Sequence, residues 1–407
     1  MAPRRRRALR LTTKKTHTKA ASLKGGDPSA PTDAEWAGMK FFKTFVVEDA
    51  GESHPFKIGD VALIAPDSYD PEVPMEPHEF WVGSIRDVRA RGPEDVWAKV
   101  QWYWSGADVA GYMSKSFDAS WIGKYERVFS DKFDYVSSLA FEEVITMNDY
   151  QENALNARQI TNTEFYCRFD LEHKAKRLMP HPSTLICLCK RLYNPDDTGP
   201  ENIMHYCPRK NCRRAWHRGC LISQGSTSTD TSQGRERFLK SDPDKSGEEA
   251  TNPRPPRKKT RLLRGSRNGK QKAATTDDDD DDDEKTAFLS LLDRRLVRAA
   301  LQPILRPWPP SAPLLSGNVS RVTNARKIVL EALRTGEVED GWEKFVTESG
   351  PDEEQELLQE EEEVSVEEVQ VERVTRAGSG RKSKSKKATE SNGPALILVC
   401  PLCSGPV

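Results

Sequence analysis

The sequence lacks several features by which common classes of protein are recognised. It contains no run of about 18 apolar residues, which excludes a membrane-spanning helix. It starts without an apolar signal-peptide core, so we do not expect a disulfide framework. It has no Gly-rich phosphate loop, and Cys167 has no His or Asp partner that can be placed beside it. No catalytic constellation emerges, and we predict that the protein is not an enzyme.

Apolar residues are also scarce. They make up 36% of the 407 residues, charged residues make up 31%, and the mean hydropathy is -0.72, so a large part of the chain cannot bury a core. The net charge of -1 hides opposed blocks: residues 1–24 and 253–272 each hold nine Lys or Arg and no acid, whereas residues 277–284 and 352–363 are acidic. The four arginines at 4–7 predict a nuclear localisation signal or a weak, non-specific DNA contact. The alternative is a merely solvated tail.

Cysteine is rare, but its placement is informative. Seven of the eight cysteines and one histidine form four close pairs: Cys187 and Cys189, Cys207 and Cys212, His217 and Cys220, Cys400 and Cys403. Eight such ligands make two tetrahedral zinc sites with no open position. Closed sites are structural, so the zinc is expected to build a recognition surface.

The order of ligand types, with the histidine fifth, resembles the PHD finger, a chromatin module that binds two zincs cross-brace. The resemblance implies that one zinc is held by Cys187, Cys189, His217 and Cys220, and the other by Cys207, Cys212, Cys400 and Cys403. A RING ubiquitin-ligase finger usually has the histidine fourth. Its RING-CH variant has one residue between the third and fourth ligands, where this chain has four. A zinc-finger ubiquitin ligase is therefore the alternative class.

A long insertion separates the last ligand pair from the others. Between Cys220 and Cys400 lie 179 residues. Three doublings of loop length cost about 2 kcal/mol, which is small beside the roughly 10 kcal/mol or more of structural zinc binding. The finger can therefore close around the insertion.

The finger shows no complete methyl-lysine cage. Ala215 and Ile186 stand where methyl-reading fingers usually carry aromatic residues. Tyr193 and Met204 could still line a surface, and two acids could pair with a histone amino terminus or an arginine: Asp196 and Asp197. We predict that the finger is a structural buttress, or binds an unmodified tail or a protein partner.

Upstream of the finger, short extended runs alternate with turns. They cover residues 39–47, 56–65, 80–88, 96–104, 126–134 and 141–147. Many short strands separated by Gly, Pro and Asp predict a β-rich barrel or sandwich-like domain of about 130 residues. Alternation over residues 96–104 places Trp102 and Trp104 on one face of their strand.

The runs FKIGDVALIAPD, FWVGSIRDV, VQWYW and YERVFSDKFDYVSS, in this order, resemble a BAH domain over residues 40–175. BAH beside PHD is the layout of the plant short-life and early-bolting readers and of fungal readers of Polycomb-type histone methylation. The resemblance implies that Trp81, Trp102 and Trp104 form an aromatic cage for a trimethylated lysine of the histone H3 tail. It also implies that Asp134 contacts the peptide, with Lys132 in place of the usual histidine. The alternative is that the tryptophans are core.

The predicted fold class is therefore a mainly β BAH domain plus a small zinc-stabilised PHD-type cross-brace finger, interrupted by a long insertion with a small α-helical unit. Helical spacing over residues 285–305 and 318–334 predicts this unit. We expect its apolar residues to form a packed core; the alternative is a docking surface for a corepressor. The predicted segments are a disordered basic tail (1–35), the BAH domain (36–178), the first part of the finger (185–222), a disordered linker with an acidic run (223–284), the helical unit (285–348), a disordered linker (349–395) and the last ligand pair (396–407). The predicted function is nuclear chromatin binding in Polycomb-type repression or heterochromatin. Direct DNA binding is a further alternative.

Overall fold

The computed structural model describes residues 11–14, 29–49, 51–66, 69–197, 199–228, 237–239, 288–309, 313–346 and 397–407. The arginines at 4–7, most of the linker predicted over 223–284 and all of the linker predicted over 349–395 lie outside them. The chain divides into two compact units. The first contains residues 1–206, 213–224 and 304–319, and the second contains residues 207–212, 225–303 and 320–407.

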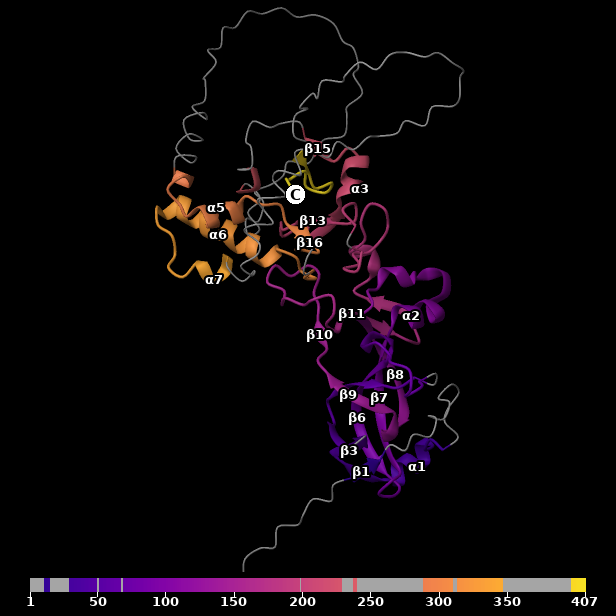
Figure 1. The fold of residues 1–407 in the computed structure, drawn as a ribbon. Helices are drawn as coiled ribbons and strands as arrows, with labels where there is room; N and C mark the ends of the chain where they lie inside the picture. The colour runs from indigo at the N-terminus through magenta and orange to yellow at the C-terminus, as the bar shows by residue number, and fades with distance from the viewer. Residues whose placement is uncertain are drawn as a thin grey trace, which may run out of the picture. The chain divides into compact units, whose positions relative to one another are not determined.

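The first unit is built on a nine-stranded sheet, whose order is β10-β11-β8-β7-β6-β5-β9 with β2 paired to β6 and β12 paired to β11 (Figure 1). Its strands are β2 (Lys40–Phe42), β5 (Val61–Ile64), β6 (Trp81–Ala90), β7 (Val96–Trp104), β8 (Glu126–Ser137), β9 (Phe141–Ile145), β10 (Asn148–Asp149), β11 (Tyr166–Glu172) and β12 (Arg177–Met179). A second, three-stranded sheet has the order β1-β3-β4: β1 (Leu11–Lys14), β3 (Thr44–Asp49) and β4 (Glu52–Lys57). Short helices connect the strands: α1 (Asp33–Gly38), η1 (Pro77–Glu79), α2 (Gly106–Met113), η2 (Ser114–Ser116), η3 (Ala119–Trp121), η4 (Ser138–Ala140) and η5 (Pro182–Thr184).

An aromatic cluster holds the two sheets together. Phe45 of β3, Phe56 of β4 and Phe141 of β9 are fully buried, and their ring centroids lie 5.1–5.4 Å apart. Strand β7 is buried on both faces along its first half, since Val100 packs into this core while Trp97 packs with Trp36 of α1. The mainly β fold class predicted from the strand-like runs is confirmed.

Two local expectations differ from the structure. Residues 11–14, inside the predicted disordered tail, form β1, because Leu11 and Thr13 are buried and the strand pairs in parallel with β3. The run over residues 56–65 is two strands instead of one. Gly59 turns the chain at a φ of +99°, a conformation that glycine adopts without steric strain. The Asp60 carboxylate accepts the Lys57 amide hydrogen at 2.9 Å and stabilises the turn.

The finger in the first unit contains a small sheet of order β14-β13-β16, followed by a helix: β13 (Met204–Cys207), β14 (Arg214–His217), β16 (Leu305–Arg306) and α3 (Arg218–Ser223). Strand β16 comes from the insertion. Sequence reasoning assigned residues 285–348 to one helical unit, but residues 304–319 belong to the first unit.

The second unit contains helices of the insertion and the strands next to the last ligand pair: α5 (Arg294–Ala300), α6 (Val319–Thr335), α7 (Glu343–Val346), β15 (Thr227–Ser228) and β17 (Ile397–Leu398). The helix predicted over 285–305 is shorter, since Asp293 caps α5 by accepting the Arg295 amide hydrogen. Leu296, Val329 and Trp342 are buried in one cluster, as the packed-core reading expects. Within the described residues, no helix is long and apolar enough to span a membrane.

Candidate aromatic cage and metal centres

The three predicted cage tryptophans lie on one face of the β6–β7 ladder. Gly83 faces Trp102 and Val82 faces Tyr103 in antiparallel register. Residues that face each other across such a ladder, and residues two apart along one strand, point to the same side. Trp81, Trp102 and Trp104 therefore share a face at the end of the two strands, and all three side chains are half-buried.

Trp81 and Trp102 form the tight part of this group. Their rings meet edge to face, with centroids 5.8 Å apart and planes at 83°. The Trp102 indole Nε1 donates to Asp134 Oδ2 at 2.8 Å, so the predicted peptide-binding carboxylate also fixes the ring. Glycine at position 83 leaves room for Val100 and for the Trp102 ring, because a Cβ there would lie 2.1 Å from Val100 Cγ1 and 3.5 Å from Trp102 Cε3.

A bulge in β8 shapes the rim beside Trp102. Gln101 pairs with Phe133 and Tyr103 pairs with Phe129, so the single residue Trp102 is opposed by three residues of β8, at 130–132. Bulges of this kind re-aim side chains next to functional sites. The bulge leaves Lys132 and Asp134 exposed.

Trp104 belongs to a second aromatic group. Its ring contacts Tyr112 at 5.4 Å and His173 at 5.6 Å, and the Tyr112 and His173 rings are stacked at 4.2 Å. The Lys176 ammonium lies 4.8 Å from the Tyr112 centroid. Sequence reasoning missed Tyr112, although Ser105 with the acid three residues later forms a capping box that signals helix α2 directly after β7.

The structure brings together the first predicted ligand set, in which Cys187, Cys189, His217 and Cys220 place their ligand atoms within 4.8 Å of one another. His217 Nδ1 lies 3.3 Å from Cys189 Sγ and 3.9 Å from Cys220 Sγ. Burial and then Arg191 lower the pKa of His217, which favours the neutral imidazole that a metal binds. Burial opposes ionisation of Cys189, but hydrogen bonds from Arg191 lower the pKa of that thiol.

The second set, in the second unit, is formed by Cys207, Cys212, Cys400 and Cys403, whose sulfurs also lie within 4.8 Å of one another. The Cys207 and Cys403 sulfurs are 3.7 Å apart, close to the roughly 3.8 Å that Zn–S bonds of about 2.3 Å give in a tetrahedron. Hydrogen bonds from Cys207 and Cys400 lower the pKa of Cys403, and the Arg209 guanidinium, 3.2 Å from that sulfur, acts in the same direction. Both clusters could hold a metal ion.

Local strand pairing brings the distant ligand pair into place. β15 and β17 pair antiparallel, with Thr227 facing Leu398 and Ser228 facing Ile397. The Cys400 amide donates to Gly405 O at 2.7 Å, which closes a tight loop around the last two ligands. This pairing joins the start of the insertion to the chain directly before Cys400 and so brings the last ligand pair to the finger.

A buried ion network ties the β domain to the finger. The Arg168 guanidinium of β11 bonds both Glu126 oxygens at 3.0 Å and Glu152 Oε2 at 2.7 Å. It also donates to the carbonyl of Tyr193 in the finger at 3.0 Å and to that of Trp121 at 3.3 Å. Sequence reasoning missed this network, since no local pattern marks a buried arginine.

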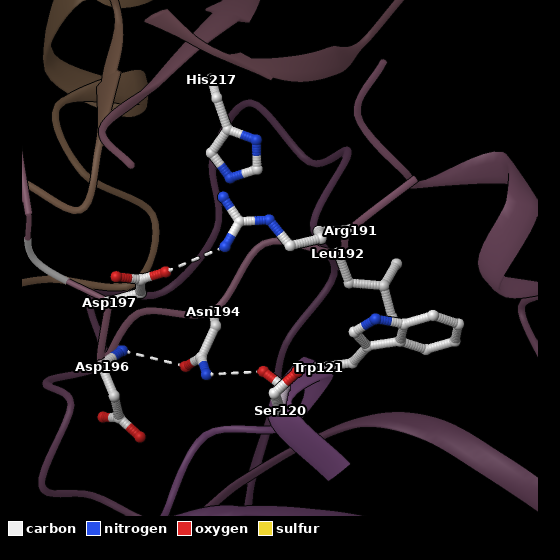
Figure 2. Close-up of a pocket in the computed structure, with 8 residues that line it drawn as sticks. All are labelled: Ser120, Trp121, Arg191, Leu192, Asn194, Asp196, Asp197 and His217. Carbon is white, nitrogen blue, oxygen red and sulfur yellow. Dashed lines mark hydrogen bonds and ion pairs between the residues drawn. The ribbon is translucent and has the colours of Figure 1, made fainter. Parts of the chain in front are cut away.

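A pocket of about 210 Å³ lies between the η3 segment and the finger (Figure 2), lined by Ser120, Trp121, Arg191, Leu192, Asn194, Asp196, Asp197 and His217. The two acids that were considered as partners for a histone amino terminus already have partners in the chain. Asp196 Oδ2 accepts the Lys124 amide at 2.6 Å, and Asp197 pairs with Arg191 at 3.7 Å. Asn194 donates to the Ser120 carbonyl at 2.9 Å and so closes one wall.

The finger residues that could have lined a binding surface are not available for one. Tyr193 is 1% exposed and Met204 is 0% exposed. Both side chains are packed inside the first unit, so the expectation that they line a binding surface is wrong.

Comparison with known proteins identifies two relatives from Arabidopsis thaliana. Chromatin remodeling protein EBS is 22% identical over 185 residues, which is 45% of this chain and 69% of EBS. Chromatin remodeling protein SHL is 25% identical over 123 residues, which is 30% of this chain and 48% of SHL, so the match spans about half of that relative. The crystal structure of the yeast Rsc2 BAH domain aligns with a TM-score of 0.21 and 14% identity, over 31% of this chain and 49% of that one.

No protein-family profile matches the chain. Both curated relatives carry chromatin remodeling in their names. The resemblance to the BAH–PHD chromatin readers that the sequence predicts is thereby confirmed.

Proposed function

We propose that the protein is a non-enzymatic chromatin reader of the nucleus, which binds a trimethylated lysine of the histone H3 tail through Trp81, Trp102 and Trp104 and acts in Polycomb-type gene repression. The observation that carries the proposal is the set of three half-buried tryptophans on one face of the β6–β7 ladder. Trp81 and Trp102 pack against one core cluster and Trp104 against another, but none of the three is buried as fully as Trp97, which is 2% exposed.

The chemistry of the ligand fits these rings. Trimethyl-lysine keeps its positive charge but has no N–H to donate, so it is held by cation–π attraction and apolar contact. Each ring contributes roughly 0.5–2 kcal/mol, depending on desolvation. The edge-to-face arrangement of Trp81 and Trp102 presents two ring surfaces at right angles, which suits a rounded cation.

Asp134 acts in two ways in this proposal. Its Oδ2 accepts the Trp102 indole hydrogen and fixes the ring plane. Its exposed carboxylate supplies negative charge beside the cage, where a basic histone tail would lie. Lys132, exposed in the same bulge, cannot accept a hydrogen bond while charged, so this position does not hold the peptide as a histidine would.

Zinc is the proposed occupant of both ligand clusters. Each cluster offers four sulfur or imidazole ligands, which fills a tetrahedral site and leaves no position for a substrate. Zinc bound there contributes folding free energy. The finger then acts as a buttress for the β domain, since Tyr193 and Met204 are buried and Arg168 bonds the Tyr193 carbonyl.

Corepressor proteins are the proposed partners of the second unit. Its core is internal, but Leu291 and Phe345 are 80% and 48% exposed and could contact another protein.

The test is a titration of the full chain against H3 peptides in which each candidate lysine is unmodified or trimethylated. We expect one trimethylated peptide to bind with an affinity that changes little between low and moderate salt. Binding to DNA with a steep salt dependence and no response to methylation would favour the DNA-binding alternative. Activity in an autoubiquitination assay would favour the ligase.

A further inference from the structure

The insertion occupies one edge of the finger's sheet. Strand β13 pairs with β14 on one side and with β16 on the other. In the β16 pairing, Met204 faces Arg306 and His205 faces Leu305 in antiparallel register. The Tyr206 amide also donates to Ile304 O at 2.8 Å. Figure 1 shows β16, coloured orange for its place in the insertion, beside β13.

Without β16, β13 would present a free edge. A row of unpaired N–H and C=O groups is a template for an extended peptide, and main-chain pairing of this kind is a common mode of peptide recognition. The segment that fills the edge is about 100 residues further along the chain than β13. It therefore approaches the finger as a ligand would, as a separate extended strand.

Arg306 anchors this strand in a closed pocket. The side chain is 0% exposed, and its guanidinium lies 4.0 Å from the centroid of the Tyr206 ring. Nη1 donates to the Glu152 carbonyl at 2.6 Å, and Nε donates to Ser316 O at 3.3 Å. An arginine stacked on an aromatic ring with carbonyl acceptors around it is held by the geometry that recognises arginine in general.

Residues 313–318 are docked just as closely. Leu315 O accepts the hydroxyls of Tyr150 and Tyr193, each at 3.0 Å, so one carbonyl bonds both the β domain and the finger. The segment turns back at Gly317, whose φ is +58° and where a Cβ would lie 1.8 Å from Leu305 O. The turn thus requires glycine.

We infer that residues 304–309 and 313–318 are an internal ligand of the finger, which closes the β13 edge to other extended peptides and fills its arginine pocket with Arg306. A peptide that uses this edge must displace the segment. If the segment is displaced from the β13 edge in about one molecule in a hundred, an external peptide binds the chain about 100-fold more weakly than it binds a permanently open edge. The inference concerns the finger and does not depend on the tryptophan cage.

The test adds the segment back as a separate peptide. A labelled peptide of residues 303–318 is titrated by fluorescence anisotropy into the full chain carrying zinc and into its Arg306→Ala variant. We expect the variant to bind the peptide about 100-fold more tightly than the unaltered chain does. A peptide in which alanine replaces its own arginine should not bind to either. Arg294→Ala, an exposed arginine of α5, is the matched control and should behave as the unaltered chain.

A second measurement keeps the inference testable if Arg306→Ala does not fold. Hydrogen exchange of the unaltered chain should show the Tyr206 amide protected, because it donates to Ile304 O. Exchange of that amide at the rate of an open strand edge would overturn the inference. Equal affinity of the peptide for the unaltered chain and for a folded Arg306→Ala variant would overturn it as well.

Discussion

Replacing Arg168 with leucine should destabilise the first unit strongly. The guanidinium is 1% exposed and bonds two carboxylates that are 0% and 5% exposed, those of Glu126 and Glu152. Its removal leaves two uncompensated buried acids, and breaking such a pair by deleting one partner costs about 3–5 kcal/mol. The carbonyls of Trp121 and Tyr193 lose donors too. We therefore expect a loss at the upper end of that range, measured by guanidinium denaturation of the full chain with zinc.

The matched control is Arg177→Leu, on strand β12, which pairs with the strand that carries Arg168. Arg177 bonds both oxygens of Glu172 at 2.8 and 2.9 Å, but both side chains are about half exposed. Exposed pairs contribute little, so the denaturation midpoint should barely move. Equal effects of the two substitutions would refute the reasoning, since the difference rests on burial alone.

The Arg168→Leu variant should also respond to acid in a defined direction. Burial raises the pKa of Glu126, while Arg168 lowers it, so loss of the arginine raises the pKa further. A carboxyl whose folded-state pKa exceeds its unfolded value favours the folded chain when it is protonated. The deficit relative to the unaltered chain should therefore shrink as the pH falls from about 7 toward about 5. A deficit that grows over this range would contradict the assignment.

Other perturbations follow from close contacts and from the ligand clusters. Gly83→Ala should cost about 1–3 kcal/mol by overpacking, because its Cβ would meet Val100 Cγ1 at 2.1 Å; Gly92→Ala, with nothing within 4 Å, should cost little in the same thermal denaturation. Mass spectrometry of the metal should find two zinc ions per chain, fewer in Cys189→Ser, and an unchanged content in Cys167→Ser, since Cys167 lies outside both clusters. Burial raises the pKa of Cys167 to about 12, which suits a thiol that binds no metal.

Much of this molecule could be predicted because its signals are local. The four ligand pairs are close in sequence, and the clusters group them as the cross-brace resemblance implies. Period-2 alternation put Trp102 and Trp104 on one face, and the register of β6 with β7 adds Trp81 to it.

The features that could not be predicted depend on contacts between distant residues. The strand pairing of Leu11 with β3 and the burial of Arg168 between two acids are set by tertiary packing. Composition instead assigns the first of these segments to a disordered tail. The docking of Arg306 against the finger also depends on distant contacts and could not be predicted. In the sequence its segment lies between two helices of the insertion and has the pattern of a connecting loop.

The most direct test of the proposed function compares two aromatic residues on neighbouring strands. Trp102 lies in the candidate cage, whereas Phe133 of β8 is 40% exposed and faces Gln101, one residue out of phase with Trp102. The full chain and its Trp102→Ala and Phe133→Ala variants are titrated calorimetrically with the H3 peptide that binds best in its trimethylated form. The account predicts that Trp102→Ala abolishes the preference for trimethyl-lysine while Phe133→Ala retains it. Undiminished methyl-dependent binding by a folded Trp102→Ala variant would contradict the cage.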